Sequence, residues 1–410
     1  MKKILVVAES IDVEDSSGTK GRVALIKNLY KAGFELQVYH YTRKNIELKN
    51  IPCHAIRENR RSLLFFLSRL ERYLRYWFNL KVYKQIEQAF GFSFTLFNDR
   101  NSIVRALNKI RDFDPDMVLT LSKGGSYRPH HALLKLPGWH SKWVANIHDP
   151  YPFACYPRPY DWVEPGYLKK RKFFLKLGEK ASHIAYPSKL LAELMESYYA
   201  PMRGKRLIIP HQTFESDTTA INLPAYFKNN AFSLVHAGTL LGPRNPRSLI
   251  KAFQKFIQEN PEAADHSQLI LIGRKSKYSK EFKEVMQVFP QFYSTEAYIP
   301  FSKVLAIQNN AAVNIILEAK SSISPFLPGK FPHCIQAGKP ILLLGPYYSE
   351  SKRLLGNDYP WWSEIDDEDK IFAMIEELYS NWRSNNSQCD YHSLGKYLSE
   401  TYLSDQISSL

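Results

Sequence analysis

The stretch Ser324–Gly345, SPFLPGKFPHCIQAGKPILLLG, decides how the second half of the chain is interpreted. It begins with a loop of two prolines and a glycine, continues with a lysine and a short apolar segment, and ends in an aliphatic run. The run 339–345 predicts a buried parallel strand, and the segment before it predicts a short helix closed by Gly338. Because the free amides of a helix start favour anions, the loop before the helix predicts a phosphate or diphosphate cradle. The alternative is a plain connection with an exposed lysine. The residues of the predicted cradle are Pro328, Gly329 and Lys330.

Strands and helices alternate on both sides of this stretch. Apolar runs that predict buried strands occur at 2–9, 34–41, 114–122, 142–149 and 181–188, and again at 232–240, 267–275, 312–319 and 339–345. Helix-period segments separate most of them, so the sequence predicts an α/β protein with two doubly wound sheets. We expect a first domain over 1–205, a second over 206–385, and a final segment over 386–410.

The 410 residues suit two domains. Four cysteines, Cys53, Cys155, Cys334 and Cys389, form no CxxC pair, which argues against a disulfide framework or a structural zinc and fits a reducing cytosol. The N-terminal apolar run is too short for a signal peptide, and no window is long enough to span a membrane.

Positive charge is concentrated in the first half of the chain. The net charge is +15; residues 1–200 carry 33 basic and 19 acidic side chains, whereas residues 201–410 carry 22 and 21. This asymmetry predicts that the first half meets an anionic partner such as a membrane surface, a nucleic acid or an acidic ligand.

Ligands of open parallel sheets bind beyond the carboxyl ends of the strands. Three strands of the second half end beside residues that suit an anion, so we expect these ends to share one crevice. They are Gly238, Thr239 and Arg244 after the first strand, Arg274 and Lys275 after the second, and Lys330 beyond the third.

The same residues resemble a known family. The opening stretch resembles the S-x-K-x-x-E-x-x-A-x-G-K-P segment of family 4 nucleotide-sugar glycosyltransferases. HAGTLLGPRNPRSLIKAF (236–253) resembles their G-T-L-x-x-x-R-x-P segment, and KWVANIHDPYP (142–152) resembles their first-domain strand ending in His-Asp. The resemblance implies a GT-B fold, in which two Rossmann-like domains face each other across a cleft. It also implies a donor site in the second domain, an acceptor site in the first, and a last helix that returns to the first domain.

The resemblance assigns roles to particular residues. Arg244 and Lys330 match the cations that hold the donor diphosphate, and His148 matches the histidine of the first domain. His333 stands where the family often has the glutamate that binds the donor ribose, and Thr239 stands where it has an arginine. From its place at the strand end, Asp149 is a candidate base together with His148, and Glu318 a candidate for binding sugar hydroxyls.

Residues 57–90 interrupt the alternation of strands and helices. They predict a long amphipathic helix or a helix pair with an aromatic-rich apolar face and a basic face, a pattern typical of helices at a membrane interface. The alternative is an ordinary packed helix with a solvated basic side. The residues assigned to the membrane are Arg61, Phe66, Arg69, Arg72, Arg75 and Trp77.

Three motifs are weaker. SSGTKG (16–21) lacks the Walker pattern, and we interpret it as a flexible loop in which Gly18 and Gly21 let a ligand approach. DDED (366–369) is better explained by capping of the next helix than by a metal. The histidines of PHH (129–131) are better explained as the start of a helix, since a third ligand is not evident.

The sequence therefore predicts a cytoplasmic, metal-independent hexosyltransferase that needs no cofactor besides its nucleotide-diphosphate sugar donor. Its acceptor would be a glycan or a lipid-linked glycan at the inner face of the membrane, with an anionic membrane surface as partner and no nucleic acid. Two alternatives stay open: a basic protein that binds polyanions or nucleic acid without catalysis, and a GT-B nucleotide-sugar epimerase.

Overall fold

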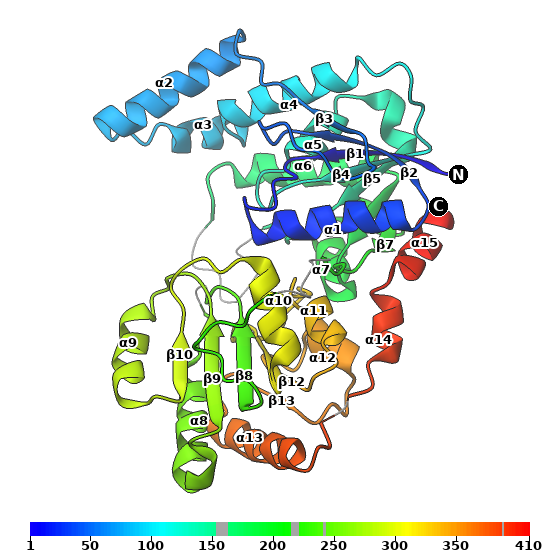
Figure 1. The fold of residues 1–410 in the computed structure, drawn as a ribbon. Helices are drawn as coiled ribbons and strands as arrows, with labels where there is room; N and C mark the ends of the chain where they lie inside the picture. Colours follow the sequence, from blue (N-terminus) through cyan, green and yellow to red (C-terminus); the bar gives the residue numbers. More distant parts are fainter. Residues whose placement is uncertain (153–162, 215–220, 241–242, 388) are drawn as a thin grey trace. The chain divides into compact units, whose positions relative to one another are not determined.

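The computed structural model describes residues 1–152, 163–214, 221–240, 243–387 and 389–410. The chain divides into two compact units, one formed by Met1–Gln212 with Ser399–Leu410 and the other by Thr213–Leu398 (Figure 1). Cys155 and most of the proline-rich loop that follows His148 lie outside the described residues. Cys53, Cys334 and Cys389 are free thiols.

The first unit is built on a parallel sheet of seven strands in the order β3-β2-β1-β4-β5-β6-β7. The strands are β1 (Lys3–Ala8), β2 (Glu35–His40), β3 (Cys53–Ala55), β4 (Met117–Leu121), β5 (Trp143–Asn146), β6 (His183–Tyr186) and β7 (Arg206–Ile208). β4 and β5 are buried along their whole length, as expected for central strands that are covered on both faces.

Helices cover this sheet. They are α1 (Ser17–Lys31), α2 (Leu63–Phe78), α3 (Tyr83–Phe90), α4 (Phe94–Leu107), α5 (Arg128–Leu133), α6 (Tyr167–Lys180) and α7 (Lys189–Tyr198), with 3-10 turns at Pro137–Lys142 and Ala200–Met202. The core between helices and sheet is rich in aromatic rings: Phe174 is fully buried, and its ring centroid lies 4.7 Å from that of Tyr151 and 4.9 Å from that of Tyr127.

The last helix, α15 (Glu400–Ser408), belongs to the first unit. It packs against α1, and Lys2 Nζ donates a hydrogen bond to the carbonyl oxygen of Ile407 at 2.9 Å. Buried Leu403 and Ile407 supply its apolar contact. The chain therefore returns at Ser399 to the unit in which it began.

The second unit contains a parallel sheet of six strands in the order β10-β9-β8-β11-β12-β13. The strands are β8 (Phe232–Ala237), β9 (Ser267–Ile272), β10 (Phe292–Ser294), β11 (Val313–Leu317), β12 (Ile341–Leu344) and β13 (Trp362–Ser363). The helices are α8 (Arg247–Glu259), α9 (Ser279–Val288), α10 (Phe301–Asn310), α11 (Phe331–Gln336), α12 (Glu350–Leu355), α13 (Glu368–Arg383) and α14 (His392–Tyr397), with a 3-10 turn at Pro261–Ala263.

Both sheets have a Rossmann-like strand order, which confirms the predicted α/β class. In each sheet the order reverses beside the first strand, between β1 and β4 in one unit and between β8 and β11 in the other. Loops leave these neighbouring strands in opposite directions, which opens a crevice at the carboxyl ends. The two switch points are therefore the places to examine for ligand sites.

Candidate functional site

At the switch point of the second unit, Lys330 lies over the end of β8. Its Nζ is 3.2 Å from Nε2 of buried His236, while Nδ1 of that ring lies 3.2 Å from the carbonyl oxygen of Ile315. Nζ also lies 3.1 Å from Nδ1, so the ammonium group lies close to both nitrogens of the ring. Burial, together with Lys330 and Arg244, holds the pKa of His236 well below its usual value, so the ring stays neutral beside the ammonium group.

Gly238 permits this close approach. A Cβ at Gly238 would lie 3.2 Å from Lys330 Nζ, and the residue has a φ of +154°. Gly273, at the end of β9, in turn packs on the Gly238 carbonyl, since a Cβ there would lie 2.8 Å from that oxygen. The glycines at two strand ends thus leave room for a cation directly above the sheet.

The positive charges in this crevice are not balanced by ion pairs with carboxylates in the described part of the chain. Burial and the nearby Arg244 lower the pKa of Lys330 to about 7, while Cys334 and Glu318 oppose the shift. Arg244 Nη1 makes a long contact of 3.5 Å with the carbonyl oxygen of Thr239. No carboxylate forms an ion pair with Lys330 or Arg244 among the described residues. The structure therefore brings two cations together at one strand end, where an anion would relieve their repulsion.

Glu318 follows β11 and is buried. Burial raises its pKa to about 7, against the hydrogen bonds of Ser324 and Ser351 and the charges of Arg244 and Lys330. Its Oε1 accepts a hydrogen bond from Ser351 Oγ at 2.6 Å. Gly345, at the end of β12, makes space for it, because a Cβ there would lie 2.8 Å from the Glu318 Cβ.

The loop before α11, which the sequence predicts to be a phosphate cradle, differs in two ways from the prediction. Helix α11 exists, but it has only six residues, so Lys330 and not a helix dipole provides the main positive charge. Gly329 is exposed, with no atom within 4 Å of a Cβ placed on it, so close packing does not require glycine there. Pro328 accepts a backbone hydrogen bond from the amide of Phe331 at 2.8 Å and so starts the helix.

Other predicted donor residues lie around this centre with different environments. His333 is buried in α11, its pKa falls to about 4 through burial, and its ring centroid lies 5.1 Å from that of Phe301. Arg274 is exposed and lies over the Tyr298 ring at 5.4 Å. Lys275 is exposed as well, and Thr239 is half-buried. Of the predicted donor residues, the structure thus gathers Gly238, Arg244, Glu318 and Lys330 at one place.

In the first unit, the expected pair His148 and Asp149 lies just beyond β5. His148 Nε2 is 3.3 Å from Asp149 Oδ2, and burial lowers the pKa of the imidazole although the carboxylate opposes this. Gly124 provides the space: a Cβ there would lie 2.1 Å from Asp149 Oδ2 and 3.8 Å from His148 Nε2. A neutral imidazole beside a carboxylate is suited to accept a proton.

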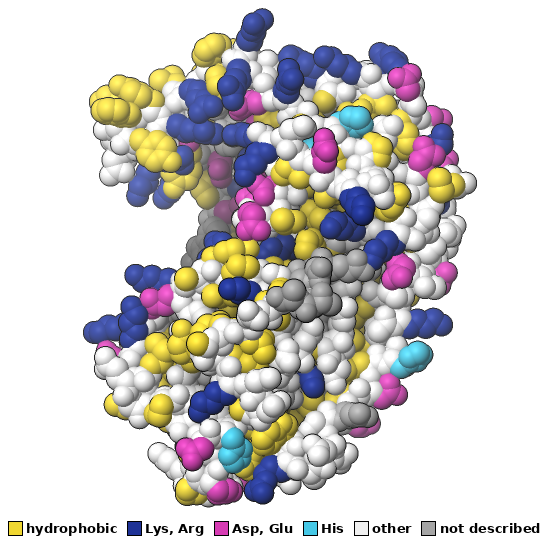
Figure 2. Space-filling view, viewed as in Figure 1, with side chains coloured by type: hydrophobic (Ala, Val, Ile, Leu, Met, Phe, Trp, Pro, Cys, Tyr) yellow, Lys and Arg dark blue, Asp and Glu magenta, His cyan; other side chains and the backbone are white. Residues whose placement is uncertain are grey.

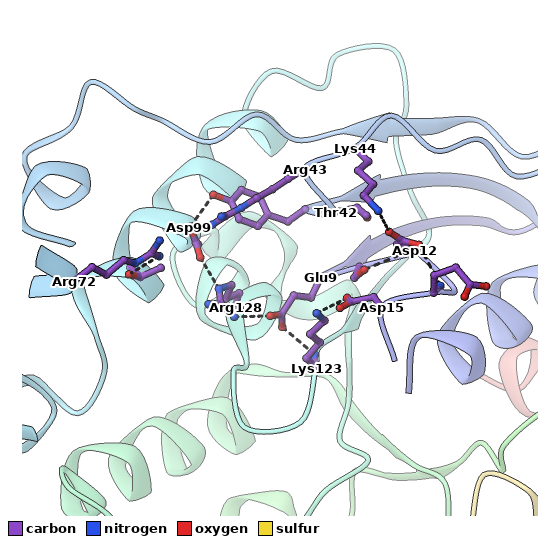
Figure 3. A pocket seen from close by; sticks show the side chains of 14 residues that line it. Glu9, Asp12, Asp15, Thr42, Arg43, Lys44, Arg72, Asp99, Lys123 and Arg128 are labelled. Atoms are coloured by element: carbon purple, nitrogen blue, oxygen red, sulfur yellow. Dashed lines mark hydrogen bonds and ion pairs between the residues drawn. The ribbon is translucent and has the colours of Figure 1, made fainter. Parts of the chain in front are cut away.

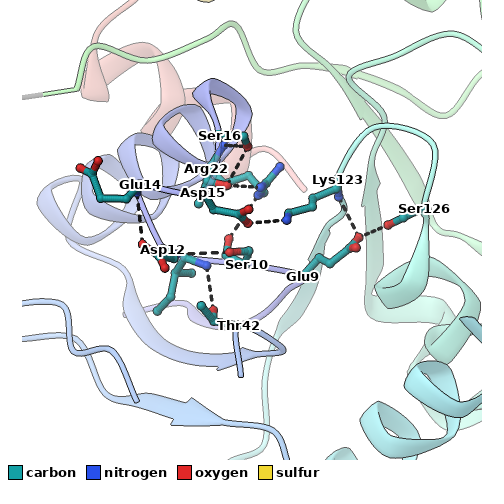
Figure 4. Close-up of polar contacts among 12 residues, drawn as sticks. Glu9, Ser10, Asp12, Glu14, Asp15, Ser16, Arg22, Thr42, Lys123 and Ser126 are labelled. Atoms are coloured by element: carbon teal, nitrogen blue, oxygen red, sulfur yellow. Dashed lines mark hydrogen bonds and ion pairs between the residues drawn. The ribbon is translucent and has the colours of Figure 1, made fainter. Parts of the chain in front are cut away.

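Sequence reasoning missed a buried arginine next to this pair. Arg22 of α1 donates to the carbonyl oxygens of Ser10 and Ser122 at 3.3 and 3.1 Å and to Thr19 Oγ1 at 2.6 Å. Burial lowers its pKa to about 10, while Glu9, Asp15 and Asp149 raise it. Figure 4 shows Arg22 among the polar side chains that follow β1. The sequence feature that could have indicated Arg22 is a charged residue near the start of an otherwise apolar helix face.

The prediction of a flexible loop at Gly18 and Gly21 was wrong. Both glycines lie in α1, whose N-terminus is capped by Ser16: the hydroxyl accepts a hydrogen bond from the Thr19 amide at 3.2 Å. The capping serine outweighs the low helix propensity of the two glycines. A Cβ at Gly21 would lie at an ordinary contact distance of 3.9 Å from His211 Nδ1, so packing does not require glycine there.

Residues 57–90 form a helix pair, α2 and α3, and α2 exposes its apolar side. Its buried residues are the polar Ser68 and Glu71, and it packs on α4. The alternative of an ordinary packed helix with a solvated basic side therefore fails. The large exposed apolar side chains of this region are Leu63, Phe66, Leu70, Tyr73, Tyr76, Trp77, Phe78, Leu80 and Phe90. Figure 2 shows hydrophobic side chains next to Lys and Arg in the region of α2 at the upper left.

The arginines of α2 divide into two groups, which corrects the expected arrangement. Arg61 and Arg69 are exposed. Arg72 is half-buried and lines a cavity, with Nη2 at 3.5 Å from Thr95 Oγ1. Arg75 is half-buried too, over the rings of Tyr76 and Tyr83. Arg72 and Arg75 therefore lie on the packed side of α2, away from the proposed membrane.

The two metal-like motifs lie at the helix positions predicted for them. Asp367 caps α13 by accepting from the Lys370 amide at 3.1 Å, and His130 and His131 lie in α5. His131 stacks on Phe173 at 4.1 Å between ring centroids. Among the described residues no group of three potential metal ligands occurs, and no helix is long and apolar enough to cross a membrane.

Two Rossmann-like parallel sheets, each with polar groups at its switch point, and a last helix that joins the first unit define a GT-B glycosyltransferase fold. A glycosyltransferase from Rickettsia africae matches over 100% of this chain and 93% of its own, with a TM-score of 0.56 and 12% identity. A UDP-forming α,α-trehalose-phosphate synthase from Burkholderia xenovorans matches over 100% and 98%, with a TM-score of 0.60 and 9% identity. WaaG, a glycosyltransferase involved in lipopolysaccharide biosynthesis, matches over 100% of both chains, with a TM-score of 0.57 and 10% identity.

Sequence comparison adds nothing to this result, since neither a protein-family model nor a curated protein sequence matches the chain. At identities of 9–12% the structural likeness shows the fold alone.

Proposed function

We propose that this protein is a glycosyltransferase that moves a sugar from a nucleotide-diphosphate sugar to a glycan or lipid-linked acceptor. The reaction would take place in the cytoplasm, at the inner face of the membrane. The observation that carries this proposal is the meeting of Lys330 and Arg244 above the glycine-lined end of β8, beside the switch point of the second sheet.

The proposed role of these cations follows from the chemistry of the leaving group. Breaking the bond between sugar and diphosphate leaves negative charge on the diphosphate. Preorganised cations stabilise such charge most strongly where water is excluded. Lys330 is half-buried, and Arg244 is close enough to lower its pKa, so the two cations would stabilise the leaving diphosphate without a metal ion. Glu318, on the neighbouring strand end, would accept hydrogen bonds from hydroxyls of the donor sugar.

The acceptor side belongs to the first unit in this proposal. In an inverting reaction a base removes the proton of the acceptor hydroxyl, and the pair His148 and Asp149 is suited to that task. In a retaining reaction no such base is needed, and His148 would position the donor sugar. No cofactor is required in either case.

The membrane part of the proposal rests on α2. A soluble protein rarely exposes a contiguous set of large apolar side chains, and such a set beside arginines fits the boundary between lipid tails and anionic headgroups. Phe66 and Trp77 are 60% and 77% exposed, and the neighbouring Arg61 and Arg69 are exposed as well.

The donor site is tested by titrating the full chain with UDP-, GDP-, CMP- and ADP-linked sugars and by following their turnover. We expect Lys330→Ala and Arg244→Ala each to weaken binding of the preferred donor by about 10–100-fold, because a charge-assisted contact contributes about 1.5–3 kcal/mol. Lys277→Ala is the matched control, because that lysine is exposed and lies over the Tyr278 ring. Equal donor binding by all four proteins would refute the assignment.

The membrane assignment is tested by flotation with vesicles that contain anionic lipid. We expect the protein to float, with Phe66→Glu and Trp77→Glu each abolishing flotation at unchanged thermal stability. Val288→Glu is the control, since Val288 is 80% exposed in the second unit. Flotation that survives both substitutions in α2 would show that another surface binds the vesicles.

A further inference from the structure

The first unit contains a cavity of about 530 Å³ at the carboxyl ends of β1, β2 and β4. Its size suits a small-molecule ligand. Figure 3 shows its lining residues, which are polar or charged, although their carbon atoms contribute as much of the surface as their polar atoms. The charged lining residues are Glu9, Asp12, Glu14, Asp15, Arg43, Lys44, Arg72, Asp99, Lys123 and Arg128.

One side of the cavity is a fully bonded framework. Buried Asp99 accepts from Tyr41 OH at 2.7 Å and from Arg128 Nε at 2.6 Å, and Arg128 Nη1 also donates to Glu9 Oε1 at 2.5 Å. Glu9 Oε2 accepts from the amide of Lys123 at 2.9 Å. These groups satisfy one another, so they provide a rigid wall and leave little charge for a ligand.

Two further guanidinium groups on the Asp99 side are weakly engaged. Arg43 Nη2 lies 3.5 Å from Glu58 and 3.6 Å from Asp99, longer than an ordinary charge-assisted hydrogen bond. In the described part of the chain, the polar contact of Arg72 is the 3.5 Å approach to Thr95 Oγ1. Figure 3 shows Arg43 and Arg72 on the same side of the cavity as Asp99. Arg43 and Arg72 therefore keep N–H donors that no carboxylate engages at ordinary hydrogen-bond distance in the described part of the chain.

The backbone of Arg43 adds an independent observation. It has a φ of +66°, a left-handed conformation that costs an L-residue about 1–3 kcal/mol and that clusters at ligand sites. The residue directly before it, Thr42, also lines the cavity, and its hydroxyl accepts from the Ile11 amide at 3.0 Å. The strained turn thus holds Arg43 at the rim although a relaxed turn would be more stable.

The other side of the cavity offers carboxylates and ammonium groups in pairs. Lys44 Nζ lies 2.5 Å from Asp12 Oδ2, and Lys123 pairs with Asp15. With Glu14 in addition, acidic groups outnumber basic ones on this side. Paired carboxylates and ammonium groups can accept from and donate to the hydroxyls of a polyol at the same time.

From this polarity we infer that the cavity binds a phosphorylated sugar, with the phosphate held between Arg43 and Arg72 and the sugar hydroxyls on the side of Asp12 and Asp15. The inference rests on the proposed function, in which the first unit binds the acceptor, and it names the acceptor's chemical class. Arg72 belongs to α2, whose opposite side is the exposed apolar face, so the phosphate could come from a sugar phosphate in solution or from a lipid-linked one.

The test measures binding to the full chain without any donor. Glucose 6-phosphate, glucose and inorganic phosphate are titrated separately, and vesicles of phosphatidylcholine with phosphatidylinositol present a phosphorylated polyol on lipid. We expect a phosphorylated polyol to bind more tightly than glucose or inorganic phosphate. Tightest binding of glucose 6-phosphate identifies a free sugar phosphate. Preference for these vesicles over vesicles with an equal amount of phosphatidylserine, which offer the same charge to α2 without a polyol, identifies a lipid-linked one.

Variants test whether the phosphorylated polyol binds in the cavity or is only attracted by the positive charge of the protein. We expect Arg43→Gln and Arg72→Gln each to weaken binding of the phosphorylated polyol at least about tenfold, since each removes a charge-assisted contact. Arg105→Gln is the matched control: it makes the same change in the same unit, at an exposed position of α4 outside the cavity lining. Thermal denaturation verifies that all three variants fold.

Three results would overturn the inference: no phosphorylated polyol binds, inorganic phosphate binds as tightly as either of them, or Arg105→Gln weakens binding as much as the cavity variants. Failure here is distinguishable from failure of the proposed function, because Arg43→Gln and Arg72→Gln leave the second unit intact. They should bind the donor nucleotide sugar normally, whereas Lys330→Ala should not.

Discussion

The dependence of donor binding on pH gives the sharpest test of the site in the second unit. Lys330 has a pKa of about 7 instead of its usual 10.5, because burial and Arg244 disfavour the ammonium form. A bound diphosphate favours that form, so binding takes up a proton when the pH exceeds the pKa of the free protein. Raising the pH from 6 to 8 should therefore weaken binding about tenfold through Lys330 alone.

A second group acts in the same direction. Glu318 has a pKa of about 7, raised from 4.5 chiefly by burial, and ionises over the same range. Its negative charge disfavours an anion nearby, so it weakens binding further as the pH rises. His236 stays neutral throughout, since its pKa is lowered well below 6.5, and the thiol of Cys334 stays protonated because burial raises its pKa to about 12.

The assay is calorimetric titration of the full chain with its preferred nucleotide sugar between pH 6 and 8. A nucleotide sugar is used because both phosphates of its diphosphate diester stay ionised over this range. Arginine stays charged at every pH used, so Lys330→Arg should lose the part of the pH dependence of donor affinity that comes from Lys330. Glu318→Gln should remove the part that comes from Glu318. An affinity that does not change with pH, or a full pH dependence in Lys330→Arg, would refute the proposed electrostatics.

Three further substitutions test the geometry of the two units. Gly124→Ala should lower turnover strongly with little change in stability, since a Cβ 2.1 Å from Asp149 Oδ2 displaces only the tip of a side chain; unchanged kcat/KM would contradict a role for that carboxylate. Gly345→Ala should weaken donor-sugar binding, because its Cβ would lie 2.8 Å from the Glu318 Cβ, and equal Kd values for mutant and wild type would show that Glu318 is not needed. Phe174→Ala should lower the free energy of unfolding by about 3–5 kcal/mol in a denaturant titration, with a loss below 1 kcal/mol arguing against the stacked core.

The order of apolar runs was enough to predict two doubly wound sheets. A strand buried on both faces has to be mainly apolar, so β4, β5, β11 and β12 are visible in the sequence as mainly apolar runs. The places where such strands end are visible too, and the donor candidates Gly238, Arg244, Glu318 and Lys330 were found in that way.

Predictions from local sequence patterns were wrong or incomplete where helix capping or tertiary packing had the larger effect. Gly18 and Gly21 suggested a loop, but the Ser16 hydroxyl bonds the Thr19 amide and starts α1 there. The amphipathic pattern of α2 was correct, but periodicity cannot tell which side of a helix is packed. Contacts with α4 bury Ser68 and Glu71 and leave Phe66 and Trp77 in solvent.

The sequence by itself determined the class of fold and the strand ends that carry charge. Apolar runs mark the buried strands, and the polar residues that follow each run mark its carboxyl end. Only the tertiary structure decided which charges meet. Strand order brings β8 beside β11 and β1 beside β4, and close packing at Gly124, Gly238 and Gly345 sets how near the side chains come. The cavity of Arg43 and Arg72 depends on segments far apart in sequence, and no short pattern could have revealed it.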